Sequence, residues 1–383
     1  MTATTMTVGV DVSPLGSAHT GIARYTYELI AALQRVWPEG RVTAIANRSQ
    51  VQLPPPPTGG RLPVRGPVFP SRSAWTFGLL PLWLRGAGVD VFHATSYYAP
   101  IGARLPTVVT IHDLGTFVWP DLHPRTRVLR ARAALPVVAR RAAAVIVPSR
   151  SVEAEVVAWL GLRPERVRVI PEAPADAFRR PVPSAEVAAA LARYGLDPGF
   201  FLAVGALEPR KNLGRVAEAL DLLSGERGEA VPPLVVAGPA GWKFDSLEGR
   251  VRPPGVVDGV RFLGFVPDPD LRALMDAARG LLYPSLYEGF GLPVVEAMAA
   301  GLPVVTSCSG ALAELAAGAA LLVDPLDIES IAAAMRQLLD DEALHRRLVE
   351  LGRARAAEYT WERTARQTLD VYRTAVEPAG ARR

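Results

Sequence analysis

Short apolar runs rich in β-branched residues recur along the chain, and each is bounded by turn residues and followed by a stretch with helical periodicity. Strands that are apolar at consecutive positions are typical of parallel sheets covered by helices on both faces. Six such strands and then six more predict an α/β protein with two doubly wound, Rossmann-like domains. The predicted strands lie at residues 7–12, 41–46, 89–94, 107–112, 144–149, 167–171, 200–205, 233–238, 260–264, 280–285, 302–307 and 319–324.

The boundary between the two domains is expected near residue 178. The stretch from Ala173 to Pro183 contains three prolines and interrupts the alternation of strand and helix, which is typical of a linker. We therefore expect an N-terminal domain at 1–178 and a C-terminal domain at 179–360. A helix predicted from about residue 361 follows the last strand, and we expect residues 361–383 to pack back on the N-terminal domain.

Composition and charge exclude several classes of protein. The 383 residues carry a formal charge of only +4, and arginines are scattered among nearly as many carboxylates, so we expect no nucleic acid as partner. A single cysteine, Cys308, cannot form an internal disulfide. The first residues do not form a signal peptide, and no apolar run of about 18 residues is present. We expect a cytoplasmic protein.

An arginine-rich stretch at residues 125–145 and an aromatic patch of Trp75, Phe77 and Trp83 raise the question of membrane contact. A basic surface of this kind can touch anionic lipid. The alternative is that the arginines are solvated and the aromatic side chains lie in the core. Peripheral association with the inner face of the membrane therefore stays open at this point.

Residues that follow the predicted strands are the candidates for ligand binding, because open parallel sheets bind ligands at the carboxyl ends of their strands. Arg210 and Lys211 stand side by side at a strand-to-helix turn, and Lys211 is one of only two lysines in the chain. An arginine and a lysine there can neutralise a diphosphate. The alternative is a solvated basic turn. Gly205 and Gly238 end two neighbouring predicted strands.

A glycine-rich turn follows the strand at 280–285, with Glu288 at its start and Glu296 eight positions later. Pro293 predicts the start of a helix, whose free N–H groups can approach an anion or sugar hydroxyls across the two glycines of the turn. Glu296 is expected in the first turn of this helix, where the dipole alone would favour a carboxylate. The two carboxylates can also flank one bound molecule and accept hydrogen bonds from its hydroxyls.

The other polar residues at strand ends are histidines and aspartates. His112 follows the strand at 107–112 and is interpreted as facing the ligand, whereas His93, followed by ordinary residues, is interpreted as structural. Asp268 and Asp270 have the spacing of a metal-binding pair, but they begin a predicted helix and are interpreted as a helix cap. No zinc or Walker spacing is present, and we expect no metal site.

Several motifs together resemble glycosyltransferase family 4, a family of retaining glycosyltransferases with the two-Rossmann GT-B fold. The segment E-G-F-G-L-P-V-V-E from Glu288 to Glu296 is similar to the E-x7-E motif of that family. The resemblance covers nearly the whole chain and is closest to bacterial mannosyltransferases of polysaccharide assembly. Two positions depart from the family pattern, Ala206 in place of an arginine and Thr20 in place of a glycine. Other similar stretches are T-G-I-A-R-Y at 20–25, I-H-D-L at 111–114, V-I-V-P-S at 145–149, V-G-A-L-E-P-R-K-N at 204–212, R-F-L-G-F-V at 261–266 and A-A-L-L-V-D-P-L-D at 319–327.

The resemblance implies a role for each motif residue. The cations hold the donor diphosphate, Glu296 binds the ribose, Glu288 and the N–H groups after it hold the transferred sugar, and His112 lies over that sugar. The nucleotide base rests near Phe265 and Val266, and Gly21 approaches the donor phosphate or the acceptor. The expected catalytic residues are His112, Glu288, Arg210 and Lys211, and the expected donor-binding residues are Gly21, Gly205, Arg210, Lys211, Gly238, Phe265, Val266, Glu288, Gly289, Phe290, Gly291, Leu292 and Glu296.

The implied reaction is a retaining, metal-independent transfer from a nucleotide-sugar, with GDP-mannose as the expected donor and no cofactor. The expected acceptor is a glycan, a lipid-linked sugar or a small molecule. A glycoside hydrolase that uses Glu288 and Glu296 as its two carboxylates is an alternative, as is a nucleotide-sugar epimerase of the same fold. A sugar-binding protein without catalysis is a third. A dehydrogenase is disfavoured because Gly289-x-Gly291-x-x-Val294 lacks the third glycine of the dinucleotide fingerprint.

Overall fold

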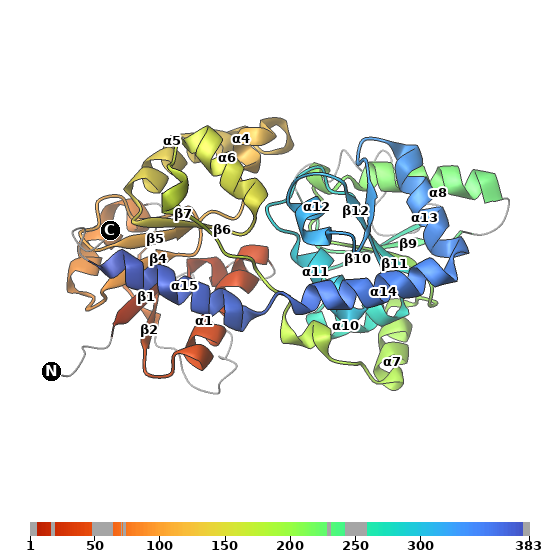
Figure 1. Cartoon of the computed structure of the whole chain (residues 1–383), viewed down its shortest axis with the longest axis horizontal. Helices are drawn as coiled ribbons and strands as arrows, with labels where there is room; N and C mark the ends of the chain where they lie inside the picture. The colour runs from red at the N-terminus through yellow and green to blue at the C-terminus, as the bar shows by residue number, and fades with distance from the viewer. Residues whose placement is uncertain are drawn as a thin grey trace. The chain divides into compact units, whose positions relative to one another are not determined.

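The computed structural model describes residues 6–16, 20–47, 64–69, 71, 74–227, 231–241 and 259–377 (Figure 1). The chain divides into two compact units. The N-terminal unit comprises Met1–Val118, Arg125–Glu172 and Thr360–Arg383, and the C-terminal unit comprises Trp119–Pro124 and Ala173–Tyr359. Each unit is an open parallel sheet with helices on both faces.

The sheet of the N-terminal unit has seven strands in the order β3-β2-β1-β4-β5-β6-β7, and all of its neighbours pair in parallel. The order reverses between β1 and β4, which is the switch point at which open α/β sheets bind ligands. The strands are β1 (Thr7–Asp11), β2 (Arg41–Ile45), β3 (Val64–Arg65), β4 (Val91–Ala94), β5 (Thr107–Thr110), β6 (Ala144–Val147) and β7 (Val167–Val169).

Helix α1 (Gly21–Val36) buries one apolar face, on which Leu29 and Leu33 are fully buried. The first helix begins at Gly21, and the hydroxyl oxygen of Thr20 caps it by accepting a hydrogen bond from the N–H of Ala23 at 3.2 Å. The last helix, α15, packs against α1 in the same unit (Figure 1). The helices are α1 (Gly21–Val36), α3 (Leu80–Trp83), α4 (Gly115–Val118), α5 (Arg125–Arg141), α6 (Arg150–Leu160) and α15 (Trp361–Val376), with a π-helical turn at Trp75–Leu79 and 3-10 turns at Ser13–Gly16, Leu84–Gly86 and Pro164–Arg166.

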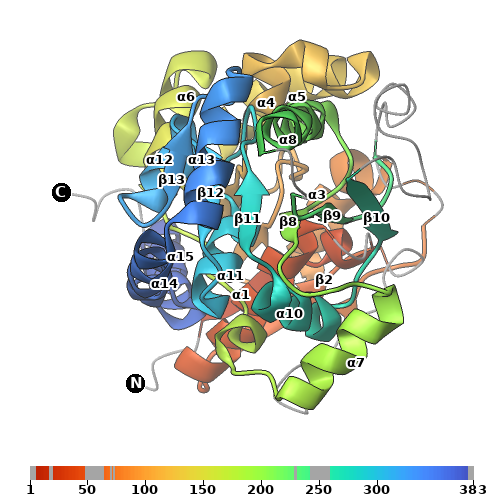
Figure 2. The same cartoon turned by 90° about the vertical axis from the view of Figure 1, so that its right-hand side faces the viewer.

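The sheet of the C-terminal unit has six strands in the order β10-β9-β8-β11-β12-β13, again all parallel. Its helices lie in two layers, with α8 and α13 on one face of the sheet and α10 and α11 on the other (Figure 2). The strands are β8 (Phe201–Val204), β9 (Leu234–Ala237), β10 (Val260–Gly264), β11 (Gly280–Tyr283), β12 (Val304–Ser307) and β13 (Leu321–Val323). The helices are α7 (Ser184–Tyr194), α8 (Leu213–Arg227), α10 (Asp268–Ala277), α11 (Leu292–Ala300), α12 (Gly310–Ala316), α13 (Ile328–Asp340) and α14 (Glu342–Ala357), and 3-10 turns lie at Pro120–Leu122, Asp176–Arg179 and Pro209–Lys211.

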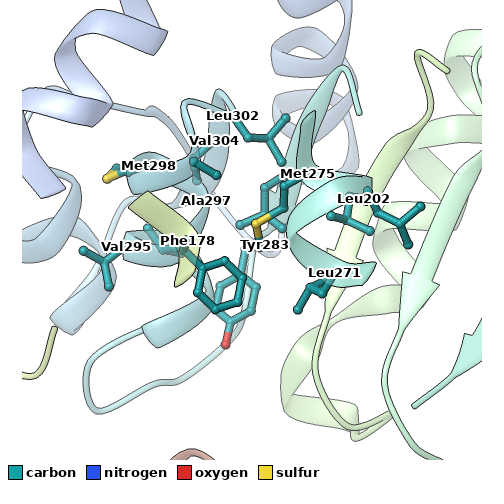
Figure 3. Close-up of a cluster of buried hydrophobic side chains, with 14 of the residues drawn as sticks. Phe178, Leu202, Leu271, Met275, Tyr283, Val295, Ala297, Met298, Leu302 and Val304 are labelled. Carbon is teal, nitrogen blue, oxygen red and sulfur yellow. The ribbon is translucent and has the colours of Figure 1, made fainter. Parts of the chain in front are cut away.

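Two hydrophobic clusters form the core of the C-terminal unit, one on each face of its sheet. Alternate strand residues point to opposite faces, so Leu202 packs with α10 and α11 whereas its neighbours Phe201 and Ala203 pack with α8 and α13. Figure 3 shows the first cluster, in which Met275 and Val295 come from α10 and α11. Burial on both faces explains why the strands are apolar at nearly every position.

The predicted α/β fold with two doubly wound sheets is confirmed. All twelve predicted strands are present, and each lies within its predicted range. The additional strand β3 has only two residues, Val64 and Arg65, and the sequence has no apolar run there that would predict it. The division of the chain falls between Glu172 and Ala173, before the predicted boundary at 178, because Phe178 is fully buried in the core of the C-terminal unit.

Candidate functional site

The loop after β8 is held in place by the backbone and side chain of Asn212. This residue has a left-handed backbone (φ 61°) between the turn Pro209–Lys211 and α8, a conformation that asparagine tolerates better than most residues. Its side-chain amide donates hydrogen bonds to the carbonyl oxygens of Pro284 at 3.1 Å and Pro325 at 2.6 Å. The loop is therefore fastened to the segments that follow β11 and β13.

Three of the predicted site residues form one charged cluster at this edge of the sheet. Nζ of Lys211 lies 2.6 Å from Oε1 of Glu288, and Nη1 of Arg210 lies 2.7 Å from Oε2 of the same carboxylate. The Tyr283 hydroxyl donates to Oε1 of Glu288 at 3.0 Å and also contacts Lys211. Nε of Arg210 donates to the carboxylate of Glu208 at 2.8 Å. The two cations are thus positioned by Glu288 in this structure.

Burial and mutual attraction set the charge states of this cluster. Burial lowers the pKa of Lys211 to about 8, and the neighbouring Arg210 adds to this effect, although Glu288 opposes it. Burial would raise the pKa of Glu288, but Arg210 and Lys211 outweigh it and hold that pKa at about 2. At neutral pH the cluster therefore contains two cations and an ionised carboxylate, and it can accept an anion that takes over one of the cations.

The glycines at the ends of β8 and β9 make room for this lysine. A Cβ at Gly205, which has φ 129°, would lie 3.1 Å from Cε of Lys211. A Cβ at Gly238 would lie 2.0 Å from the carbonyl oxygen of Gly205, so the two loops touch through their backbones. The N–H of Gly238 donates to the carbonyl oxygen of Gly264 at the end of β10. Both predicted glycines therefore border Lys211 or its loop.

Helix α11 begins directly after the glycine-rich turn, as the sequence predicts. Gly291 caps the helix with a left-handed backbone (φ 110°), and a Cβ there would lie 2.7 Å from Leu312. Pro293 is in the first turn, as predicted. Among the described residues, no backbone acceptor pairs with the N–H groups of Phe290, Gly291 and Leu292. These groups are available to a ligand, as is typical of a helix N-terminus.

The position of Glu296 corrects one expectation. Glu296 is the fifth residue of α11, and no acidic residue lies in the first turn of that helix. Its side chain is buried, with 3% of the residue exposed. The favourable helix dipole falls off within the first turn, so it does not account for a carboxylate at this depth. A buried carboxylate is costly unless it has hydrogen-bonding or charged partners.

The remaining predicted residues of the C-terminal unit lie close to this edge. Phe265 and Val266 follow β10, with Phe265 45% exposed and Val266 buried. Phe290 and Leu292 are buried, and the Phe290 ring stacks edge-on against Tyr359 at 5.7 Å between ring centres. Gly289 lies between Glu288 and Phe290 in the turn. The predicted contact of the nucleotide base with Phe265 and Val266 stays a prediction.

Asp268 and Asp270 belong to the first turn of α10 and are not its cap. The capping residue is Pro267. The side chain of Asp270 accepts a hydrogen bond from the hydroxyl of Tyr194 at 2.9 Å. The prediction of a cap is therefore wrong in its detail, although these carboxylates do lie in the first turn of the helix.

His112 and Gly21 belong to the N-terminal unit. Gly21 is the exposed first residue of α1. His112 lies two residues beyond β5, with Nδ1 2.8 Å from Oε1 of Glu172 and Nε2 2.9 Å from the carbonyl oxygen of Thr95. Burial lowers the pKa of His112, but the hydrogen bond and charge of Glu172 and the Thr95 carbonyl outweigh it and leave the pKa raised. The placement of these two residues against the donor stays a prediction.

His93 has a structural role, as interpreted from the sequence. It is fully buried, and its ring nitrogens lie 2.6 Å from the Tyr372 hydroxyl and 2.8 Å from the Thr110 hydroxyl. Burial lowers its pKa to about 3, so the ring is neutral at physiological pH. It connects α15 to the centre of the N-terminal sheet.

Three functional candidates were missed from the sequence: Glu172, Thr95 and Tyr283. Tyr283 ends β11 and contacts both Lys211 and Glu288, but a tyrosine at the end of an apolar strand looks like a core residue. Glu172 is 60 positions from His112, and no local pattern connects them. Only the order of the strands, β4-β5-β6-β7, brings the residues after β4, β5 and β7 to one edge.

The described part of the chain has neither a metal-binding cluster nor a membrane-spanning helix. No group of three or more histidine, cysteine, aspartate or glutamate side chains among those residues could hold a metal ion. In the same residues, no helix is long and apolar enough to cross a membrane.

Comparison with known proteins gives one family match on each of the two sheets. The family described as Glycosyl transferases group 1 matches residues 193–355, which include the cluster of Arg210, Lys211 and Glu288. The family described as Glycosyltransferase Family 4 matches residues 19–173, which include Gly21 and His112. The two matches fall on the two sheets.

Curated relatives include bacterial mannosyltransferases. The chain is 34% identical over 309 residues to the O-antigen chain mannosyltransferase B of Escherichia coli. The aligned region covers 80% of this chain and 78% of the relative. It is 30% identical over 249 residues to the MMP alpha-(1->4)-mannosyltransferase of Mycolicibacterium hassiacum. This aligned region covers 64% of this chain and 57% of the relative. The match to the E. coli serotype-specific mannosyltransferase WbdA spans only 28% of that longer protein.

Solved structures with the same fold include glycosyltransferases of the GT-B class. A sucrose-phosphate synthase from Thermosynechococcus elongatus superposes with a TM-score of 0.74 at 24% identity, over 96% of this chain and 98% of the other. WaaG, a glycosyltransferase involved in lipopolysaccharide biosynthesis, gives 0.68 at 20% identity, over 95% and 99%. The fold is therefore GT-B. With the family matches and the E. coli relative, the chain belongs to glycosyltransferase family 4 and is a glycosyltransferase.

Proposed function

We propose that this glycosyltransferase is a retaining mannosyltransferase that moves mannose from GDP-mannose to a glycan or lipid-linked acceptor without a metal ion. The observation that carries the proposal is the cluster of Arg210, Lys211 and Glu288 beside the free N–H groups of the α11 turn. Such a cluster fits a diphosphate joined to a sugar. The names of the E. coli and Mycolicibacterium relatives support mannose as the sugar.

In this proposal the diphosphate exchanges places with a carboxylate. Glu288 bridges Arg210 and Lys211. When the donor binds, its diphosphate takes over the cations and Glu288 turns to the hydroxyls of the sugar. Carboxylates accept hydrogen bonds from hydroxyls, and cations stabilise the charge on a leaving diphosphate. Glu296 binds the ribose, and Phe265 and Val266 contact the base.

The reaction breaks the bond between C1 of mannose and the diphosphate oxygen. Negative charge develops on the diphosphate, where Arg210, Lys211 and the α11 N-terminus stabilise it. The acceptor oxygen forms its new bond to C1 on the same face, and its proton passes to the departing phosphate oxygen. In this way the configuration at C1 is retained, and no side chain needs to act as a covalent nucleophile.

The charge state of Glu288 argues against this residue as the proton donor of the hydrolase alternative. A hydrolase of this kind needs one carboxyl group with a raised pKa to protonate the leaving oxygen. Arg210 and Lys211, working against the effect of burial, hold the pKa of Glu288 at about 2. At neutral pH Glu288 is therefore negatively charged, accepts hydrogen bonds and is a poor proton donor.

The outer face of α5 supports membrane contact as part of the proposal. This helix carries six arginines and no acidic residue, and Leu129 on it is 69% exposed. On neighbouring α6, Trp159 is 53% exposed and stacks against Phe117. Arginines with exposed apolar side chains are suited to an anionic lipid surface, where a lipid-linked acceptor would lie. Co-sedimentation with vesicles rich in phosphatidylglycerol should be lost in Arg127→Glu/Arg130→Glu, and unchanged sedimentation would contradict this part.

The donor is identified by thermal melting of the protein with GDP, UDP and ADP. Mass action predicts that only the correct nucleotide raises the melting temperature at equal concentration, and we expect that nucleotide to be GDP. Glu296→Ala should weaken GDP binding, while Glu288→Ala should mainly lower turnover with GDP-mannose. No shift with any nucleotide would count against the proposed function, and a shift with UDP alone would change the donor.

A further inference from the structure

His112 faces two hydrogen-bond acceptors at once. A carboxylate oxygen of Glu172 lies 2.8 Å from Nδ1, and the carbonyl oxygen of Thr95 lies 2.9 Å from Nε2. An ionised carboxylate and a carbonyl can only accept hydrogen bonds, so a ring that satisfies both must carry a proton on each nitrogen. This arrangement requires an imidazolium, with a charge that Glu172 balances.

The surroundings hold the ring in one orientation. The Thr95 carbonyl is fixed because the hydroxyl of the same residue donates to the carbonyl oxygen of Asp11 at 2.8 Å. The ring of Tyr25 packs edge-on against His112 at 4.7 Å between ring centres, and its hydroxyl lies 3.0 Å from that of Thr110. Glu172 is buried, with 5% of the residue exposed. Neither His112 nor its partner is a mobile surface group.

Charged and titratable groups around His112 act in both directions. Burial lowers its pKa, whereas Glu172 and, more weakly, Asp113 raise it, and the net effect is a raised pKa. His93 is nearby and stays neutral, since burial and the charge of His112 lower its pKa to about 3. Tyr25 keeps its proton because burial and the charge of Glu172 raise its pKa. The charge of the group therefore resides on His112 and Glu172.

We propose that Glu172 is a positioning residue that keeps His112 as a fixed imidazolium, so that His112 contributes a positive charge and is neither a hydrogen-bond partner of the sugar nor a base. The inference rests on the proposed function for the site in which His112 acts. It assigns a role to a residue outside every motif of the sequence. It also changes the expected role of His112, because both ring nitrogens are already in use and cannot also bind sugar hydroxyls.

The first readout is the protonation state of His112 in the ligand-free protein. Nitrogen-15 chemical shifts of the imidazole ring distinguish the charged ring from the neutral one. In the wild type we expect the imidazolium to persist above the ordinary histidine pKa of about 6.5. In Glu172→Gln, which preserves the shape but not the charge, the ring should become neutral at or below that pH. A ring in Glu172→Gln that titrates like the wild type would overturn the proposal.

The second readout is the pH dependence of kcat. The kcat of Glu172→Gln should fall by about tenfold per pH unit above the ordinary histidine pKa of about 6.5, because the ring loses its proton, whereas the wild-type kcat should begin to fall only at a higher pH. Glu172→Asp should restore part of this difference. Glu153→Gln, which removes a carboxylate from the surface pair with Arg150, is the matched control and should behave like the wild type. A profile unchanged in Glu172→Gln would contradict a role for this charge.

The outcomes separate this inference from the proposed function. GDP should stabilise Glu172→Gln as much as the wild type, because Arg210, Lys211 and Glu296 are intact. If the wild type binds no nucleotide and transfers no sugar, the proposed function fails, while the ring titration still decides whether Glu172 holds His112 charged. If transfer occurs and Glu172→Gln has both a wild-type titration and a wild-type profile, only the inference about Glu172 fails.

Discussion

At the scale of single residues, the site depends on a carboxylate that serves two purposes. Glu288 pairs with both cations. A buried cation without a partner is costly, and removal of one member of a buried pair typically destabilises a protein by about 3–5 kcal/mol. Glu288 therefore keeps Arg210 and Lys211 oriented until an anion replaces it.

Glu288→Gln should separate these two purposes. The amide cannot neutralise the cations, so GDP, which supplies the missing charge, should bind the variant at least as tightly as the wild type. Turnover with GDP-mannose should fall by about tenfold or more, because the ionised acceptor for the sugar hydroxyls is lost. Isothermal calorimetry and initial rates measure the two effects. A variant with weaker GDP binding and normal turnover would contradict the proposed division of roles.

The lowered pKa of Lys211 predicts a pH dependence of nucleotide binding. Because burial and Arg210 lower this pKa to about 8, the free site loses one positive charge as the pH rises through that value. GDP binding above about pH 8 then requires uptake of a proton, and affinity should fall by up to about tenfold per pH unit. Calorimetry in buffers of different ionisation enthalpy detects the proton uptake. A constant affinity from pH 7 to 9.5 would show that Lys211 does not carry the charge.

The lowered pKa of Glu288 predicts that the protein loses stability as the pH becomes acidic. Its folded-state pKa is held at about 2, below the ordinary value of 4.5. The stabilisation from its ionised form is therefore present above about pH 4.5 and is lost as the pH falls towards 2. Urea unfolding at pH 6 and pH 3 should show a larger acid-induced loss for the wild type than for Glu288→Gln. An equal loss in both would contradict the ion pairs.

At the scale of elements, the start of α11 brings backbone N–H groups to the same edge as the cations. Its geometry requires glycine at residue 291, because φ is 110° and a Cβ would lie 2.7 Å from Leu312. The following Pro293 stabilises the first turn without an N–H to satisfy. The element combines a glycine for shape and a proline for the helix start.

Gly291→Ala should destabilise the protein by about 1–3 kcal/mol, since alanine is strained at this φ and crowds Leu312. It should also weaken GDP binding, because the N–H groups of the turn shift. Gly225→Ala is the matched control: Gly225 lies in α8 with nothing within 4 Å of an added Cβ. That change should stabilise the protein by about 0.5–1 kcal/mol. Urea unfolding measures both, and equal effects would contradict the strain argument.

At the scale of the whole molecule, the chain passes between its two units four times, at Val118–Trp119, Pro124–Arg125, Glu172–Ala173 and Tyr359–Thr360. The last passage delivers α15 to the N-terminal unit. There the Thr364 hydroxyl donates to the carbonyl oxygen of Pro171 at 2.7 Å, and Tyr372 bonds to His93. Helix α15 therefore contributes to the core of a unit whose strands all lie much earlier in the sequence.

A chain that ends at Tyr359 should keep a folded C-terminal unit but lose cooperative unfolding of the N-terminal unit. Without α15, His93 and Tyr25 lose partners that now bury them. Calorimetric melting should then show the transition of the C-terminal unit, with a melting temperature that GDP still raises. The cooperative transition of the N-terminal unit should be lost. Arg35→Gln breaks only the exposed pair with Glu362. Its free energy of unfolding should lie within about 1 kcal/mol of the wild-type value. Two unchanged transitions in the shortened chain would contradict this role of α15.

The sequence predicted the sheets well because strands buried on both faces are apolar throughout, and the pattern survives without knowledge of their partners. It predicted Arg210, Lys211 and Glu288 because they lie at strand ends in recognisable motifs. It did not predict Glu172 or Tyr283, since their roles depend on which strands become neighbours. The boundary was misplaced for a similar reason: Phe178, in a stretch rich in proline, is a core residue of the C-terminal unit.

The central claim is that Lys211 and its neighbours bind the diphosphate of the donor. The most direct measurement is calorimetric titration of GDP into the wild type, Lys211→Gln and Arg336→Gln, the last of which breaks an exposed pair with Glu226. We predict binding by the wild type and Arg336→Gln with equal affinity, and at least about tenfold weaker binding by Lys211→Gln. Equal affinity of Lys211→Gln and the wild type, or no binding of GDP to any of them, would contradict the account.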